Sequence, residues 1–174
     1  MLRASLAFVC IGALLAACGC SSVGSFDGQS WYVGETVVWE DLWEATERAM
    51  RIHSGSGISA AGEFAGHMQE VNRDAGYLET DFVFLERERV AGTEFGRKIR
   101  ARVNQEGSGW EVIVFVGQYQ RASGPHLNPD EGWSFVKREG DVEEAVIGTI
   151  KALLSNKYGT RMGTRKPPGT GAPK

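Results

Sequence analysis

The feature that most restricts the fold is a pair of adjacent segments near the middle of the chain. Residues 97–104 alternate between aliphatic and charged or polar side chains, which predicts a strand with one buried face. Residues 110–119 form a nearly continuous apolar run, typical of a central strand covered on part of both faces. The sequence Glu-Gly-Ser-Gly at 106–109 predicts a turn between them. An antiparallel sheet is therefore expected at the centre of the fold.

Two other segments have the periodicity of amphipathic helices. In 39–50, apolar residues recur at i, i+3, i+4 and i+7, and the glycine-rich stretch that follows should end this helix near His53. A second helix is expected to extend to about Asn156, with Asp141 as its N-cap and Glu144 completing a variant of the capping box. Each helix has one apolar face, so both should pack against the sheet.

Shorter segments supply the remaining expected strands. Residues 31–38 and 133–136 are each compatible with a short strand, and 68–85 predicts a strand, a tight turn over 73–76 and a second strand. The residues of this second strand that share one face by the two-residue period, and that should meet the first helix, are Leu78, Phe82 and Phe84.

Together these elements predict an α+β fold, with a small antiparallel sheet of three to five strands and both helices on one face. Trp43 and Val114 should be buried on the facing surfaces of helix and sheet. The domain is expected over 31–156, between a flexible tether at 18–30 and a disordered basic tail at 157–174.

Charge is distributed unevenly along the chain. Residues 19–156 contain 13 basic and 22 acidic side chains, a balance of 13 − 22 = −9, whereas the tail has five cations and no acid. An acidic domain argues against nucleic acid as a partner. The tail is expected either to contact anionic envelope material weakly or only to aid solubility.

The N-terminus has the features of a secretory signal. Arg3 precedes an uncharged stretch of 14 residues, which as a helix would span about 21 Å, less than the roughly 30 Å of bilayer hydrocarbon. Its end, Leu-Ala-Ala-Cys at 15–18, resembles the lipobox of bacterial lipoproteins. This resemblance implies that residues 1–17 are removed and that Cys18 becomes an acylated first residue. The alternative is an ordinary signal in which Cys18 is incidental.

An acylated Cys18 would be a durable anchor, because two or three acyl chains bind a membrane far more strongly than one. Cys10 would leave with the signal, so no internal disulfide is expected, and Cys20 is interpreted as a solvated thiol. Gly19 after the anchor resembles lipoproteins sent to the outer membrane. The protein is therefore expected in the cell envelope on a membrane facing the periplasm, with the outer membrane favoured.

The order of elements resembles the helix-grip arrangement. The helix at 39–50, followed by the strand pair around 73–80, is similar to uncharacterised envelope lipoproteins of planctomycete-type bacteria. More distantly, the segment from Trp39 to Leu154 resembles the domains of BamC, a lipoprotein accessory of the outer-membrane β-barrel assembly machine. The resemblance implies a non-enzymatic role in an envelope assembly, with another envelope protein as partner.

No group of residues forms a strong catalytic or metal-binding motif, so no cofactor and no metal are expected. His53, His67 and His126 lack partners at the spacing of metal ligands. Glu79 and Asp81 share a strand face and allow carboxylate chemistry, but salt bridges to a neighbouring basic strand are the simpler interpretation. The basic residues expected on that strand are Lys98, Arg100 and Arg102.

Tryptophans and glycines leave further alternatives. Trp39, Trp43 and Trp110 fit core positions, whereas Trp31 and Trp133 either pack or bind a partner or glycan. The glycine motifs at 54–57 and 92–96 lack the Gly-Lys-Ser ending of a phosphate loop. Three functions remain, in order of preference: an envelope protein-binding module, a module for a small hydrophobic ligand, and a hydrolase using Glu79 or Asp81.

Overall fold

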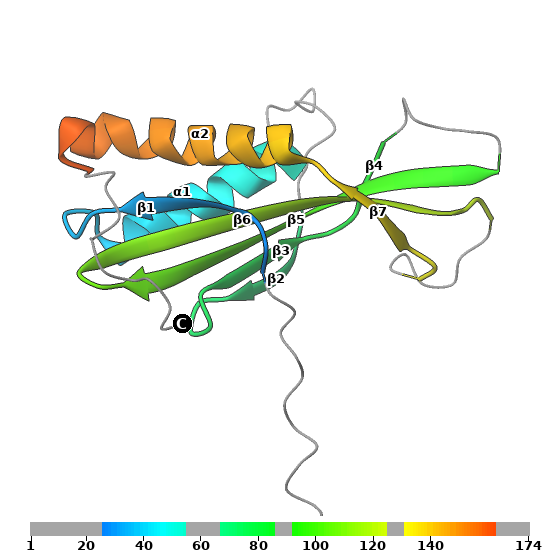
Figure 1. The fold of residues 1–174 in the computed structure, drawn as a ribbon, viewed down its shortest axis with the longest axis horizontal. Coiled ribbons are helices and arrows are strands. Elements are labelled where there is room, and N and C mark those ends of the chain that lie inside the picture. Colours follow the sequence, from blue (N-terminus) through cyan, green and yellow to red (C-terminus); the bar gives the residue numbers. More distant parts are fainter. Residues whose placement is uncertain (1–25, 55–66, 86–91, 125–130, 163–174) are drawn as a thin grey trace, which may run out of the picture.

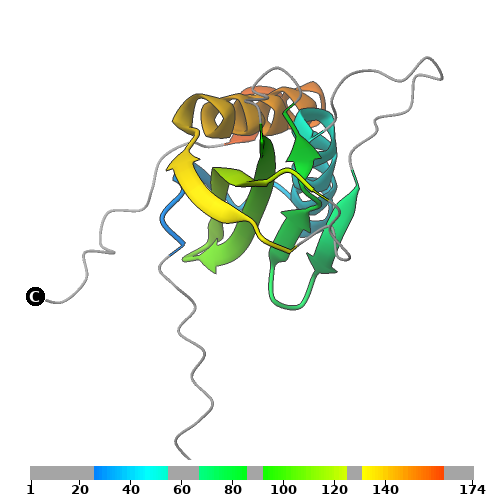
Figure 2. The same ribbon diagram turned by 90° about the vertical axis from the view of Figure 1, so that its right-hand side faces the viewer.

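The structure is a computed structural model that describes residues 26–54, 67–85, 92–124 and 131–162. Within these residues, an antiparallel sheet of seven strands carries two helices on one face (Figures 1 and 2). The elements are β1 (Gln29–Val33), α1 (Trp39–Ser54), β2 (Met68–Asn72), β3 (Tyr77–Thr80), β4 (Val83–Phe84), β5 (Thr93–Glu106), β6 (Gly109–Ala122), β7 (Ser134–Arg138), α2 (Gly140–Tyr158) and a short 3₁₀ helix (Gly159–Met162). The α+β prediction is confirmed, but three to five strands was an undercount.

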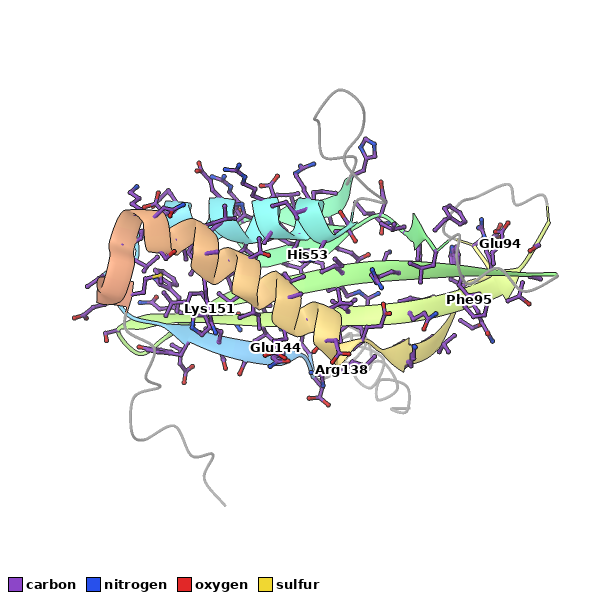
Figure 3. The ribbon with its side chains drawn as sticks, turned by 90° about the horizontal axis from the view of Figure 1, so that it is seen from above. His53, Glu94, Phe95, Arg138, Glu144 and Lys151 are labelled. Carbon is purple, nitrogen blue, oxygen red and sulfur yellow. The ribbon has the colours of Figure 1, made fainter. Side chains whose placement is uncertain are left out.

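The hairpin of β5 and β6 is the centre of the sheet. Its 14-residue strands pair without interruption from Thr93–Ala122 to Glu106–Gly109. At one end the strand order is β1-β6-β5-β3-β2, and at the other β4 pairs with β5 and β7 with β6. This second end extends past the helices (Figures 1 and 3). The expected central hairpin is therefore present and longer than predicted.

The hydrophobic core lies between the sheet and the helices. Trp43 and Val114 are both fully buried there, as predicted. Alternate residues of the central hairpin meet the apolar faces of the helices. The main contributors are Ile99, Ala101 and Val103 of β5; Val112, Val114 and Val116 of β6; Leu42, Trp43 and Met50 of α1; and Val146 and Ile150 of α2.

The predicted face of Leu78, Phe82 and Phe84 is wrong for the two phenylalanines. Strand β3 ends at Thr80, and β4 is a separate strand that pairs with β5. The irregular backbone between them resets the two-residue alternation. Leu78 is buried in the core, whereas Phe82 and Phe84 contact Trp133 on the opposite face of the sheet.

The predicted N-cap at Asp141 is also wrong. Helix α2 begins at Gly140, and its N-cap, Glu139, makes no side-chain capping bond. The backbone N–H groups of Val142 and Glu143 instead donate to the Glu139 carbonyl, each at 3.1 Å. The Glu139 carbonyl therefore accepts the first backbone hydrogen bonds of the helix.

The domain continues beyond the expected boundary at residue 156, because the end of α2 is bonded to the start of α1. Lys157 Nζ lies 2.8 Å from an oxygen of Asp41, and the Tyr158 hydroxyl donates to the same carboxylate. These two contacts lower the pKa of Asp41. The carbonyl of Met162 accepts a 2.8 Å bond from the Gly34 N–H. The rest of the predicted tail, 163–174, lies outside the described residues.

Candidate functional site

The sheet face opposite the helices carries a series of aromatic rings in mutual contact. Phe115 and Tyr119 alternate along β6 with the core residues, so they point away from the helices. Successive ring centroids lie 4.7 to 6.5 Å apart, and such pairs stabilise by about 0.5–1.5 kcal/mol each beyond their buried area. We call this set the aromatic row: Tyr77, Phe26, Phe115, Phe135, Tyr119, Phe82, Trp133 and Phe84.

Two glycines allow these rings to lie close to the sheet. A Cβ atom at Gly96 would lie 2.8 Å from the Trp133 ring, and one at Gly117 would lie 2.7 Å from the Tyr119 ring. Neither distance leaves room for a side chain, so each glycine is covered by an aromatic ring. Glycine at these positions therefore fixes where two rings of the row sit.

The centre of this face holds a network of charged groups around Glu79. Its carboxylate accepts from Lys98 Nζ at 2.7 Å, from Arg100 Nε at 2.8 Å and from the Tyr77 hydroxyl at 2.5 Å. Burial raises the pKa of Glu79, but the bonds from Lys98 and Tyr77 and the nearby cations outweigh burial and lower it. Burial, together with the neighbouring carboxylate, raises the pKa of the Tyr77 hydroxyl. Glu79 is therefore held ionised by its partners.

A second ion pair lies at the end of the sheet beyond the helices. Arg121 Nε donates to Glu94 at 2.9 Å, and its guanidinium lies 4.5 Å from the Trp133 ring centroid. Lys98 Nζ similarly lies 4.5 Å from the centroid of Phe82. The two cations thus touch both a carboxylate and a ring, and such contacts favour fixed side-chain positions.

The aromatic row is partly open to solvent. Phe135 is 55% exposed and Phe84 is 42% exposed, while Tyr119, Phe82 and Trp133 between them are half-buried. Ring contacts join these residues into one surface. The result is an apolar patch with charged residues beside it, the pattern expected of a binding surface.

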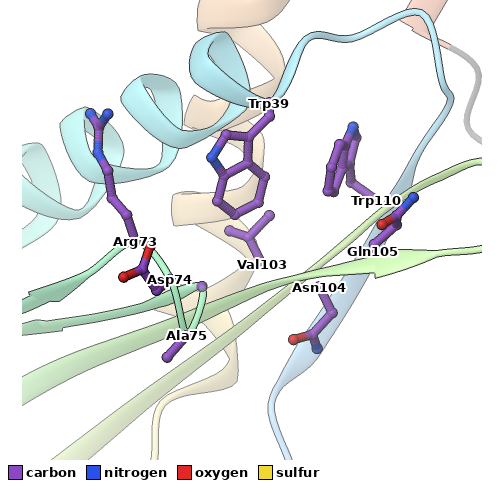
Figure 4. Close-up of a pocket in the computed structure, with 9 residues that line it drawn as sticks. Trp39, Arg73, Asp74, Ala75, Val103, Asn104, Gln105 and Trp110 are labelled. Atoms are coloured by element: carbon purple, nitrogen blue, oxygen red, sulfur yellow. The ribbon is translucent and has the colours of Figure 1, made fainter.

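A depression of about 570 Å³ lies at the other end of the sheet (Figure 4). One side is formed by Trp39 and Trp110, whose ring centroids are 5.0 Å apart, and the opposite side by the turn between β2 and β3. The indole N–H of Trp110 donates to the Val37 carbonyl at 3.1 Å. The depression is lined by indole rings and by polar groups, including Asp74 and Gln105.

The tryptophans follow the expectations only in part. Trp43 is fully buried, and Trp39 and Trp110 are half-buried against the core. Trp31 is 6% exposed and belongs to the core, which excludes it as an open binding platform. Trp133 is half-buried in the aromatic row.

The histidine and carboxylate candidates are not brought together. His53 Nε2 lies 2.8 Å from Thr149 Oγ1, and burial together with Arg97 lowers its pKa. His67 is exposed, and His126 lies outside the described residues. Asp81 is exposed and makes no ion pair within the described ranges, whereas Glu79 is bonded to the neighbouring basic strand as predicted. Groups of three or more metal-ligating side chains are absent from the part of the chain that the structure describes.

The glycine motifs lie only partly within the described residues. Ser54 ends α1, and 55–57 lie outside the described residues. Gly96 lies inside β5 beneath Trp133 and is therefore not part of a phosphate-binding loop.

The aromatic row is not apparent from the sequence alone. Its members come from five separate segments, and the strand pairings of β6 with β5 and β7 help to bring them together. One local signal was present, because a glycine inside a strand often marks a close approach by another group. Gly117 lies inside the strongest predicted strand.

The proposed anchor Cys18 and the thiol Cys20 lie outside the described residues. Among the described helices, none has the length and apolar composition required to cross a membrane. No protein-family model matches the chain, and no curated protein is significantly similar to it in sequence.

Proposed function

We propose that the chain is a lipid-anchored protein of the bacterial cell envelope whose domain binds another envelope protein through the aromatic row. The anchor in this proposal is Cys18, acylated after cleavage at the lipobox-like sequence. The proposal places the domain on a membrane facing the periplasm, with the outer membrane favoured. It assigns the domain a binding role and no catalytic activity.

The observation that carries the binding role is the continuity and exposure of the aromatic row. Aromatic and arginine side chains contribute most of the energy at protein interfaces. Phe135 and Phe84 are available to a partner, and Trp133 is packed between Phe82 and Arg121. Because neighbouring rings and ion pairs already hold these side chains, binding would cost little additional conformational entropy.

The charges on this face favour a protein over an anionic surface. Lys98 and Arg100 share Glu79, and Arg121 is paired with Glu94. These carboxylates offset most of the positive charge of Lys98, Arg100 and Arg121, which reduces the attraction of this face for anionic lipid or polysaccharide. A partner with apolar side chains and a few matched polar groups fits this surface better.

The two alternative functions have less support. A hydrophobic ligand between sheet and helices would have to displace Trp43 and Met50, which are fully buried there. A hydrolase would need Glu79 or Asp81 as an acid or nucleophile. Asp81 is exposed, and Glu79 is engaged by three donors. These donors fit a structural carboxylate better than a reacting one.

The binding role is tested by photo-crosslinking in the native envelope. A benzophenone amino acid replaces Phe135 in one chain and Glu144 in another, because Glu144 is exposed on α2 on the helix side (Figure 3). We expect one protein adduct of defined mass at position 135 and none at 144. Equal labelling at both positions, or no protein adduct at 135, would contradict the proposal.

The anchor is tested separately by fractionation. Cys18→Ser should leave an unprocessed or soluble chain, whereas Cys20→Ser, two residues away, should fractionate as the unchanged protein does. Normal processing and membrane retention of the Cys18→Ser chain would exclude the lipid anchor.

A further inference from the structure

The chain reaches its first strand across the aromatic side of the sheet. Phe26 packs against Tyr77 and Phe115, with ring centroids 6.3 and 6.5 Å away. The guanidinium of Arg102 lies 5.5 Å from the Phe26 centroid. Phe26 is thus the only member of the row that comes from the segment preceding β1, among the residues described.

Asp27 and Gly28, which follow Phe26, lie close to the sheet and to the end of β7. A Cβ atom at Gly28 would lie 2.3 Å from the carbonyl oxygen of Val114, so the backbone passes too close to the sheet for any side chain there. Asp27 lies 4.0 Å from Arg138 at the end of β7. The contacts of Phe26 and Gly28 therefore place the start of the described chain on the side of the sheet opposite the helices.

The length of the preceding segment limits how far the domain can be from the anchor. Seven residues lie between Cys18 and Phe26, and the eight steps from one to the other span at most about 29 Å when fully extended. A flexible chain of this length has a root-mean-square span of about 16 Å. With Cys18 acylated, a tether of this length would keep the aromatic row near the membrane.

We infer that Phe26 pins the tether to the aromatic row, so that the row faces the bilayer and the helices face away from it. The partner that fits such a surface is a protein embedded in, or lying on, the same membrane. This inference rests on the proposed lipid anchor. It assigns Phe26 a positioning role in addition to its place in the row.

The test measures the orientation of the acylated protein in liposomes of phosphatidylethanolamine and phosphatidylglycerol. In a Cys20→Ser background, a fluorophore is attached to Asn104→Cys on the aromatic side or to Glu144→Cys on α2. Figure 4 shows the Asn104 side chain on the side of β5 away from Trp39. Nitroxide lipids labelled at the headgroup then quench each fluorophore according to its distance from the bilayer.

We expect stronger quenching at position 104 than at position 144. In Phe26→Ser, the ratio of quenching at 104 to quenching at 144 should fall toward unity. Phe26→Tyr keeps the ring and should restore the difference. Thermal unfolding of each variant checks that the domain remains folded. Equal quenching in the unchanged protein, or an unaltered ratio in Phe26→Ser, would overturn the inference.

Two further results separate this inference from the proposals on which it rests. A chain whose mass shows no acylation contradicts the proposed anchor, whereas an acylated chain with equal quenching contradicts only the orientation. Quenching of position 104 by nitroxides deep in the acyl chains would show that lipid itself covers the row. That result would overturn the assignment of a protein partner.

Discussion

The two faces of the same sheet are built in different ways. Toward the helices, β5 and β6 present small aliphatic side chains that are almost fully buried. On the other face, most of the alternate residues of the same strands are aromatic, charged or glycine, and several remain partly exposed. Because successive side chains of a strand point to opposite faces, the same hairpin can bury aliphatic residues on one face and carry aromatic and charged residues on the other. One face therefore forms the hydrophobic core, and the other forms a partly exposed surface.

Each face also contains an ion pair with a different role. Glu143 is fully buried at the start of α2, where it accepts from the Val116 N–H and from Arg138. This carboxylate joins the helix to the sheet. Glu79 instead organises the basic side chains that lie beside the aromatic row. The comparison predicts that substitutions on the helix side reduce stability most, and that substitutions on the aromatic side mainly alter the surface.

The largest effect is expected for Trp43→Ala. Removal of this fully buried indole leaves a cavity, and the free energy of unfolding should fall by about 3–5 kcal/mol. Urea unfolding measures the change. Trp43→Phe is the control, because it keeps a ring and removes an indole N–H that lacks a partner within the described structure, so it should cost less. A loss below about 1 kcal/mol for Trp43→Ala would show that the helix side does not dominate stability.

The next largest effect is expected for Glu143→Gln. The amide keeps the shape of the side chain but loses the charge that Arg138 contacts at 2.6 Å. It also replaces one of the two acceptor oxygens with an NH₂ donor. Charged hydrogen bonds of this kind contribute about 1.5–3 kcal/mol to the free energy of unfolding. The neighbouring Glu144→Gln is a matched control, since Glu144 is exposed and its change should stay within about 0.5 kcal/mol. Equal unfolding energies for the two variants would contradict the role of Glu143.

Periodicity was sufficient to predict most of the helix side. The apolar spacing of 39–50 identified α1 and its buried Trp43, and the alternation of 97–104 identified β5 with its buried aliphatic face. These signals are local, because a residue three, four or two positions away reports on the same face. The charged partners of Glu79 were predictable for the same reason, from alternation on two adjacent strands.

The aromatic side could not be predicted in this way. The break between Thr80 and Val83 changes which side Phe82 faces, and nothing in the alternation of the segment marks it. Phe26 and Phe135 reach the row only because β1 and β7 both pair with β6. Pairings between segments so distant in sequence depend on the whole fold, so the candidate site became visible only in the structure.

A smaller effect is expected for Gly96→Ala on the aromatic side. The added methyl group would meet the Trp133 ring at 2.8 Å, so the ring must move and the free energy of unfolding should fall by about 1 kcal/mol. Gly148→Ala in α2 is the control. Nothing lies within 4 Å of its added methyl group, and alanine favours the helix, so this variant should gain about 0.5–1 kcal/mol. Urea unfolding measures both energies, and a stabilising Gly96→Ala would contradict the close packing of Trp133.

The smallest effect is expected for Glu79→Gln, and it should appear as a change in pH dependence. The pKa of Glu79 in the folded protein lies below its ordinary value of 4.5. A carboxylate with a lowered folded pKa stabilises the fold above the unfolded pKa, and this contribution is lost as the pH falls through the folded pKa. The unchanged protein should therefore have the larger free energy of unfolding at neutral pH, and its difference from Glu79→Gln should shrink as the pH falls below about 4.5. Asp41 also has a lowered pKa, so both proteins should keep a residual dependence.

Urea unfolding of both chains between neutral pH and the acid limit of folding measures this difference. Asp81→Asn is the matched control, because Asp81 lies on the same segment, is exposed and makes no ion pair among the described residues. At neutral pH its free energy of unfolding should stay within about 0.5 kcal/mol of that of the unchanged protein. A difference between Glu79→Gln and the unchanged protein that does not change with pH would mean that Lys98, Arg100 and Tyr77 do not stabilise the charged carboxylate. Packing alone would then position Glu79 and its basic neighbours. The two faces of the sheet would in that case differ only in how exposed their side chains are.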